Sequence, residues 1–192
     1  MTVHPRGVDQ GEETRRRKEE STVAQPITSP LGDQERDITA AALQATLVDL
    51  VDLSLVAKQA HWNLVGRQFH DIHLHLDELV ETARTYSDKV AERLAAIGVS
   101  PDGRARTVSA ASGVPEFAGG WVSDRDAVRQ VFESVDVVAR RVRPRIEDTE
   151  KADLVSQDLL IALTADLEEA RWMWQAQNAG YQQADPADPK SA

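Results

Sequence analysis

The chain contains no cysteine among its 192 residues. This absence excludes disulfide bonds, thiolate metal sites and cysteine nucleophiles, and it is compatible with a reducing cellular interior. Long apolar runs are missing too, since none approaches the roughly 18–20 residues that span a bilayer. The first 30 residues lack the apolar core of a signal peptide. We therefore expect a cytoplasmic protein that does not enter a membrane.

The chain has fewer basic than acidic residues, 22 against 32, and its formal net charge at pH 7 is −10. An acidic protein repels phosphate at long range, which argues against a generally basic surface that coats nucleic acid. Acidic surfaces and cavities do attract cations. Hydrophobic residues make up 41% and charged residues 28% of the chain, which fits one soluble globular domain with tails.

Residues 1–36 carry several prolines and glycines but few large apolar side chains, so the sequence predicts a mobile N-terminal tail. Within this tail lies a basic cluster with two glutamates on either side, formed by Arg15, Arg16, Arg17 and Lys18. It can be interpreted as a phosphate-binding arm or as a solvated, self-neutralising charge run. We favour the second interpretation, because the flanking acids weaken the attraction to phosphate. Residues 181–192 predict a flexible C-terminal tail.

Between the tails, residues 37–180 contain four stretches of helical periodicity. Apolar side chains recur there at steps of three and four residues, which predicts four helices: Ile38 to Leu64, Phe69 to Ile97, Ser123 past Ile146, and Asp153 to Ala179. Ser123 is the expected N-cap of the third helix. Pro144 falls inside that helix and is expected to bend or locally break it.

The connection between the second and third helices, residues 98–122, is rich in Gly, Ser and Pro. It is long for an up-down hairpin and predicts a crossover between two halves of a bundle, with a short helix inside it. No stretch has convincing strand periodicity. The fold class is therefore all-α, a four-helix bundle.

The first helix is apolar on two sides. One row contains Leu43, Leu50 and His61, and a second row contains Val48 and Leu55. A helix that is apolar on two sides is buried on two sides, so it needs either a very enclosed position or a partner beyond its own bundle.

Histidines and carboxylates on the second helix follow the helical repeat. His73 and Asp77 are four residues apart, as are Asp88 and Glu92, and eleven residues separate Asp77 from Asp88. Eleven residues are close to three turns, so all four side chains point the same way. A mixed set of imidazoles and carboxylates suits Fe(II), Mn(II) or Zn(II). His61, on the buried row of the first helix, offers another imidazole.

The two pairs are too far apart for one site. Asp77 and Asp88 are about 16 Å apart along the helix axis, whereas metal ligands lie about 2 Å from the ion. Either there are two unrelated half-sites, or a second chain completes each one. In a two-fold dimer with antiparallel second helices, His73 and Asp77 face the Asp88 and Glu92 of the other chain, which gives two equivalent sites.

Each of these ligand assignments also has a purely structural alternative. A buried histidine such as His61 is more often a hydrogen-bonded core residue, and Asp88 and Glu92 can simply decorate a solvated face. His70 and His75 are weaker candidates than His73. A catalytically silent bundle that uses these side chains for dimer packing is a third alternative. The chain lacks the Glu-x-x-His pairs of intrachain di-iron bundles.

The stretch Lys58-Gln59-Ala60-His61-Trp62-Asn63, followed by His73-xxx-Asp77 and Asp88-xxx-Glu92, closely resembles the Dps proteins, the mini-ferritins of starved or oxidatively stressed bacteria. The spacings of twelve, four, eleven and four residues match that family's ferroxidase signature at every ligand position. Trp62 matches its tryptophan beside the site, and Arg171-Trp172-Met173-Trp174 resembles its tryptophan near the end of the last helix. The resemblance covers about residues 37–178.

The resemblance implies a ferritin-like fold in a hollow homododecamer, with a di-iron ferroxidase site between subunits. His61, His73 and Asp77 then come from one chain, and Asp88 and Glu92 from its two-fold mate. Iron(II) is oxidised there, in this family usually by hydrogen peroxide in preference to dioxygen, and the ferric mineral is stored in the cavity. This protects the cell and its DNA from oxidative stress, and Trp62 is a candidate electron donor.

The resemblance has two further implications. Asp153 and Asp158 match acidic positions that line the family's three-fold ion pore, although stabilisation of a helix N-terminus explains Asp153 about as well. Many family members also compact DNA through basic tails, so the alternative function is a nucleoid-associated DNA-binding protein. The few basic residues of these tails support that role only weakly.

Overall fold

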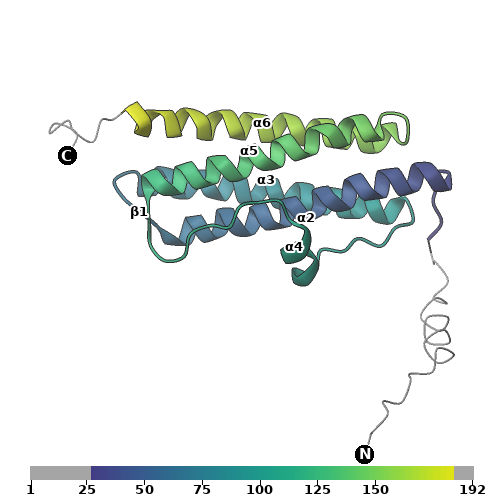
Figure 1. Cartoon of the computed structure of the whole chain (residues 1–192), viewed down its shortest axis with the longest axis horizontal. Coiled ribbons are helices and arrows are strands. Elements are labelled where there is room, and N and C mark those ends of the chain that lie inside the picture. Colours follow the sequence, from purple (N-terminus) through teal and green to yellow (C-terminus); the bar gives the residue numbers. More distant parts are fainter. Residues whose placement is uncertain (1–26, 184–192) are drawn as a thin grey trace, which may run out of the picture.

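The computed structural model describes residues 27–183, in which the chain forms five helices and two very short strands (Figure 1). In chain order these are α2 (Asp33–Asn63), β1 (Leu64–Val65), α3 (Phe69–Ala96), α4 (Ala105–Ala111), β2 (Val122–Ser123), α5 (Asp124–Thr149) and α6 (Leu154–Gln183). The prediction of an all-α bundle with a short helix in the long connection is confirmed.

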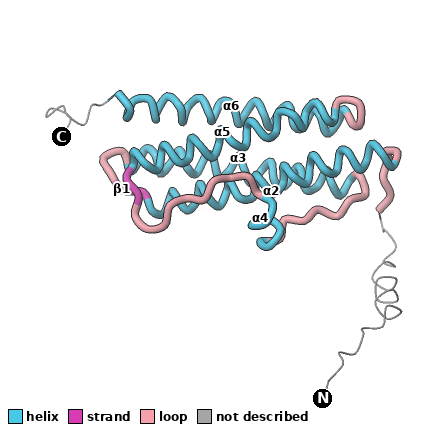
Figure 2. Tube along the Cα trace, viewed as in Figure 1, coloured by secondary structure: helices cyan, strands magenta, loops and turns pink. Residues whose placement is uncertain are grey.

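The four long helices form two antiparallel pairs. Helix α2 packs along α3, α5 packs along α6, and α2 also contacts α5 across the bundle. The connection 97–121 crosses from one end of the bundle to the other and carries α4 on the outside of α2 (Figure 2). This crossover places the start of α5 next to the end of α2.

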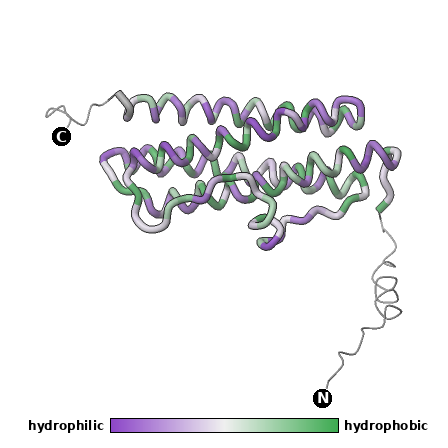
Figure 3. Tube along the Cα trace, viewed as in Figure 1, coloured by the Kyte–Doolittle hydropathy of each residue, from purple (hydrophilic) through white to green (hydrophobic). Residues whose placement is uncertain are grey.

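The core consists of the apolar rows that the helical periodicity predicts. Along each helix, hydrophobic segments alternate with hydrophilic ones (Figure 3). Fully buried side chains come from all four long helices, among them Leu43, Leu50, Leu76, Val135 and Leu163. Burying such a side chain stabilises the fold by about 1.5–3 kcal/mol. The buried apolar rows thus hold the four long helices together.

The second apolar row of α2 behaves differently from the first. Val48 is buried, Val51 is half-buried, and Leu55 is 55% exposed. By length and composition α2 is also the one described helix that could cross a membrane, with a mean hydropathy of 1.6 over its most apolar window. However, 61% of that window is buried inside the bundle, as in the core helix of a soluble protein. Within residues 27–183, the Leu55 side of the helix is left uncovered, and Trp62 is exposed as well.

The third helix begins as predicted. The Ser123 hydroxyl accepts a hydrogen bond from the Asp126 N–H at 3.1 Å and donates one to the Asp126 carboxylate at 2.8 Å, which caps α5. The sequence predicts a bend or a local break at Pro144. The helix is not broken there, since α5 continues to Thr149. Pro144 lies on the exposed side, where water can bond the carbonyl of Arg140 that the ring leaves without a partner.

Two other helix ends differ from the prediction. Helix α2 begins five residues earlier than Ile38, because Asp33 and Glu35 suit the first turn and Arg36 pairs with Asp33. Helix α6 continues past Gly180 to Gln183, and the Arg125 side chain donates to the carbonyl of Tyr181 at 2.6 Å. Local charges thus favour the earlier start of α2, and a tertiary contact accompanies the later end of α6.

The two short strands were not predicted. They pair in parallel, Leu64 with Val122 and Val65 with Ser123, where the crossover returns beside the α2–α3 turn. Gly66 follows with φ at 150°, and a Cβ there would lie 2.3 Å from the Asp124 carboxylate. That carboxylate accepts a hydrogen bond from the Gln68 N–H at 3.1 Å. Only glycine allows this close approach, which fixes the start of α3.

Candidate metal centre

Three of the predicted ligands come together where α2 and α3 run side by side. His61 from α2 and His73 and Asp77 from α3 each offer a donor atom within 4.8 Å of the others. His61 is 7% exposed, His73 is half-buried, and the two imidazoles stack with ring centroids 3.6 Å apart. One nitrogen from each ring and one carboxylate oxygen form the mixed donor set that suits a divalent transition metal.

The backbone fixes both rings reciprocally. The Nδ1 atom of His61 lies 3.0 Å from the carbonyl oxygen of His73, and the Nδ1 atom of His73 lies 3.1 Å from the carbonyl oxygen of His61. Since a carbonyl oxygen only accepts, each Nδ1 carries the proton and each Nε2 keeps its lone pair. This is the tautomer that binds a metal through Nε2, with the other nitrogen held by a hydrogen bond.

The Asp77 carboxylate is held in its charged form. Lys58, one turn before His61 on α2, donates to its Oδ1 at 2.5 Å, and the Nδ1 of His61 lies 3.3 Å from the same oxygen. The hydrogen bond from Lys58 lowers the pKa of Asp77, and the charge of Lys58 adds to this effect against a burial penalty. Asp77 is therefore an anion at neutral pH and ready to bind a cation.

Asp88 and Glu92 are not part of this group. Both are exposed on α3, and neither forms an ion pair with another residue of 27–183. This is the separation expected from their positions about three turns further along the helix. One chain thus presents a three-ligand cluster near one end of α3 and a pair of carboxylates without counterions near the other.

One aromatic ring packs against the three-ligand cluster, and a second aromatic residue follows His61 in the sequence. Phe69, one turn before His73 on α3, has its ring centroid 5.0 Å from that of His73. Trp62 follows His61 directly and is 62% exposed. It lines a groove between α2, α4 and the crossover, together with Leu55 and Phe117. This groove lies on the face of α2 that carries Leu55 and Trp62, and His61, His73 and Asp77 are not among its lining residues.

Sequence reasoning missed the parts that Lys58 and Phe69 play. Both signals are present in the sequence, since Lys58 is three residues before His61 and Phe69 is four before His73. Each is thus one helical turn from a ligand. The spacing alone does not show, however, that Lys58 reaches across to Asp77 on the neighbouring helix.

The remaining histidines lie elsewhere. His70 is exposed at the start of α3. His75 stacks on Trp174 of α6, with ring centroids 4.1 Å apart and an interplanar angle of 6°. Burial lowers the pKa of His75. Neither residue belongs to the metal cluster.

Asp153 caps the start of α6. Its carboxylate accepts hydrogen bonds from the N–H groups of Val155 and Ser156 and from Arg93 of α3, the last at 2.6 Å. Burial opposes its ionisation, but the bonds from Ser156 and Arg93 more than offset this and lower the pKa of Asp153. Asp158 is exposed on the next turn. The pore assignment of both stays a prediction, and the basic cluster Arg15–Lys18 lies outside the described residues.

Comparison with known proteins identifies a family. Residues 40–183 match the family model of the ferritin-like domain. The chain is 34% identical over 160 residues to DNA protection during starvation protein 2 of Deinococcus radiodurans, covering 83% of this chain and 65% of that protein. It is 37% identical over 150 residues to DNA protection during starvation protein of Mycolicibacterium smegmatis, covering 76% of this chain and 80% of that one.

Solved structures lead to the same family. Dps92 from Deinococcus radiodurans superimposes with a TM-score of 0.74 at 35% identity, over 81% of this chain and 92% of that one. Dps from Microbacterium arborescens in the high iron form gives a TM-score of 0.75 at 27% identity, over 80% of this chain and 99% of that one. The chain belongs to the ferritin-like domain family, and within it to the Dps proteins.

Proposed function

We propose that this protein oxidises Fe(II) and stores the ferric product, at a site that two copies of the chain complete together. The main support for this proposal is the position of the candidate ligands along α3. His73 and Asp77 join His61 in a cluster of three donors, and Asp88 and Glu92 lie exposed further along the same helix. A Dps protein solved in a high iron form supports iron as the metal. Iron is the substrate and the cargo.

The two half-sites complement each other. A cluster of two imidazoles and one carboxylate leaves coordination positions open on a bound ion. An isologous two-fold axis with antiparallel α3 helices brings the Asp88 and Glu92 of a partner to each cluster, so both sites form at once. The added carboxylates supply the negative charge that a second iron and the ferric state need.

Exposed apolar side chains on α2 support a second copy of the chain as the partner. Leu55 and Trp62 are exposed on α2 and line the groove of about 770 Å³ against the crossover. Large apolar side chains left exposed in this way are typical of a protein–protein interface. In the assembly that the Dps family implies, six such pairs form the hollow dodecamer.

Two adjacent iron ions allow hydrogen peroxide to be reduced by two electrons. Two Fe(II) ions deliver two electrons to one hydrogen peroxide molecule, which takes up two protons and gives two Fe(III) ions and two water molecules. Because both electrons arrive together, no hydroxyl radical is released. Carboxylate ligands favour Fe(III) over Fe(II), which drives the reaction forward. Trp62, which follows His61 in the sequence, is the candidate electron donor of this site.

The test measures Fe(II) oxidation with hydrogen peroxide in the wild type and in three variants. We expect His61→Ala and His73→Ala to lose most of the rapid phase, since each removes one of three ligands from the described cluster. His70→Ala is the matched control, because His70 is exposed and outside the cluster. Rates that are unchanged in the first two variants would defeat the site assignment.

The names of the relatives favour a second candidate function, the protection of DNA by direct binding. In this chain the N-terminal cluster Arg15–Lys18 offers the phosphate contacts, and the protein is then associated with the cytoplasmic nucleoid. A gel shift across a salt series tests this, because phosphate contacts weaken steeply with salt. Retardation at low salt that disappears when all four residues become Gln supports the role. Equal migration with and without protein at low salt argues against it.

A further inference from the structure

A basic cleft lies on the side of the bundle formed by α5 and α6, away from the metal centre. The α5 stretch from Arg140 to Arg145 holds four arginines within six residues, in a chain whose net charge is −10. Two of them turn into the bundle. Arg145 and Arg141 bond the fully buried Asp49 of α2 at 2.7 and 2.9 Å. The other two, Arg140 and Arg143, turn towards α6.

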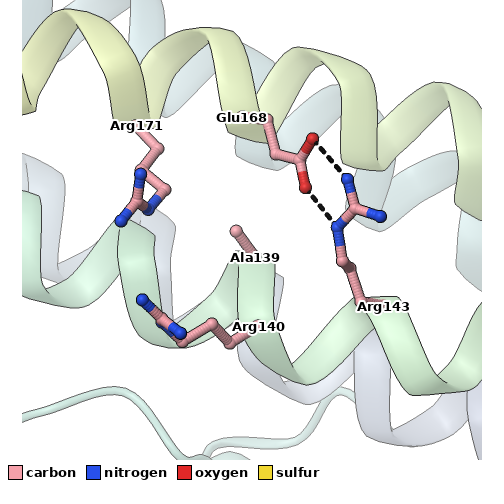
Figure 4. Close-up of a pocket in the computed structure, with 5 residues that line it drawn as sticks. All are labelled: Ala139, Arg140, Arg143, Glu168 and Arg171. Carbon is pink, nitrogen blue, oxygen red and sulfur yellow. Dashed lines mark hydrogen bonds and ion pairs between the residues drawn. The ribbon is translucent and has the colours of Figure 1, made fainter.

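Arg140 and Arg143 form the cleft together with Arg171 and Glu168 of α6 (Figure 4). The buried Ala139 forms its floor, and the small side chain there leaves a space of about 390 Å³. Arg140 and Arg171 face each other on one side of Ala139, and the Arg143–Glu168 pair lies on the other side (Figure 4). Three guanidinium groups thus surround one small opening.

Neighbouring side chains hold the three arginines in place. Asp136 accepts from the Nε of Arg140 at 2.8 Å and from the Nε of Arg171, whose guanidinium also lies over the Phe132 ring at 5.6 Å. Glu168 accepts from the Nε and Nη2 of Arg143. A planar guanidinium that is held in this way is preorganised and loses little conformational entropy when it binds an anion.

These bonds leave N–H donors to spare. Among the described residues, no hydrogen bond uses either terminal nitrogen of Arg140, the Nη2 of Arg171 or the Nη1 of Arg143. Three guanidiniums against two carboxylates also leave one net positive charge. A long polyanion such as DNA needs a row of uncompensated charges, which this surface lacks. One compact oxyanion needs only a few convergent donors and a small space.

We propose that the α5–α6 cleft is a binding site for a single phosphate-sized oxyanion, held by Arg140, Arg143 and Arg171. The ligand can be free inorganic phosphate or the terminal phosphate of a small ester, since both present the same three oxygens. Binding bridges two helices whose arginines otherwise repel each other. The site is independent of the ferroxidase cluster, so its failure and that of the proposed function are separately visible.

The test titrates inorganic phosphate into the full-length assembled protein and follows the heat of binding. We expect saturable binding below about 10 mM, and affinities about tenfold weaker in Arg140→Gln and in Arg171→Gln, because each removes a charge-assisted donor. Arg104→Gln is the matched control, since Arg104 is also paired with an aspartate but lies on the crossover, far from the cleft in sequence and 82% exposed. Its affinity should equal that of the wild type.

Three results would overturn the proposal. They are the absence of saturable heat in the wild type, an equal loss in Arg104→Gln, and Arg140-dependent binding of a short DNA duplex without binding of free phosphate. Circular dichroism checks the fold of each variant. Arg140 is mostly exposed, so Arg140→Gln decides the matter if Arg171→Gln unfolds. Fe(II) oxidation by Arg140→Gln serves as the separate readout and should stay at the wild-type rate.

Discussion

At the scale of single residues, the metal centre is organised by groups that do not themselves bind metal. Each imidazole is oriented by the carbonyl of the other histidine, so the α2 and α3 backbones set the ligand geometry directly. Lys58 plays a different part. Its ammonium group lies where it stabilises the Asp77 anion, and a metal ion that binds Asp77 has to displace this contact.

Lys58→Gln should therefore bind Fe(II) more tightly than the wild type. The substitution removes a competing positive charge next to the ligands, and Asp77 stays ionised at pH 7 because an ordinary aspartate has a pKa near 3.9. We expect a gain of about three- to tenfold in affinity, as the pair is partly exposed and solvent screens it. Anaerobic titration calorimetry measures it.

Lys89→Gln is the control for this change, since it removes the same charge from α3 at a position over the Tyr86 ring. Equal affinities in Lys58→Gln and the wild type would show that the Lys58–Asp77 pair does not compete with iron.

At the scale of elements, periodicity predicted the helices, whereas local capping and charge together with tertiary contacts decided their ends. The apolar repeat from Ile72 to Leu94 is enough to predict α3 and its buried face, because a 3.6-residue period allows no other element of that length. The β1–β2 pair could not be foreseen, since two residues carry no periodicity and the pairing depends on where the crossover returns. The family resemblance implied that His61 joins His73 and Asp77, whereas helical spacing could relate only the two residues of α3, because His61 reaches them through the packing of α2 on α3.

Asp153 links two elements, and its replacement should destabilise the bundle. Asp153→Ala removes the N-cap of α6 and the ion pair with Arg93 of α3, at an expected cost of about 1–2 kcal/mol in the free energy of unfolding at pH 7. Asp158→Ala, on the exposed next turn, should change it by less than about 0.5 kcal/mol. Urea denaturation measures both.

The effect of Asp153 should also depend on pH in one direction. Its pKa in the folded protein is lowered, so its charged form contributes stability above the unfolded-state value near 3.9. That contribution is lost as the pH falls through the lower folded-state value. The difference between Asp153→Ala and the wild type should therefore shrink below about pH 4. A difference that grows in acid would contradict this account.

At the scale of the whole molecule, a single chain does not bring all five proposed ligands together. Asp77 of its histidine cluster and Asp88 of its carboxylate pair both lie on α3, about 16 Å apart along the helix axis. No rotamer change brings them together, because a side chain reaches only a few ångströms from its backbone. The exposed Leu55 and Trp62 are apolar surface without cover from the described part of the chain. The two-fold partner that we propose would supply both the missing ligands and this cover.

Mixing two inactive variants tests this arrangement directly. His61→Ala breaks the histidine half and Glu92→Ala breaks the carboxylate half, so neither variant alone should oxidise Fe(II) rapidly. In a mixed pair, one site inherits both defects while the other combines an intact histidine cluster with an intact carboxylate pair. Random co-assembly from equal amounts makes half of the pairs mixed, so about a quarter of the wild-type sites should be restored. Stopped-flow oxidation of co-refolded chains measures this fraction. An intrachain site predicts no recovery at all, because every chain in the mixture then carries a defect of its own.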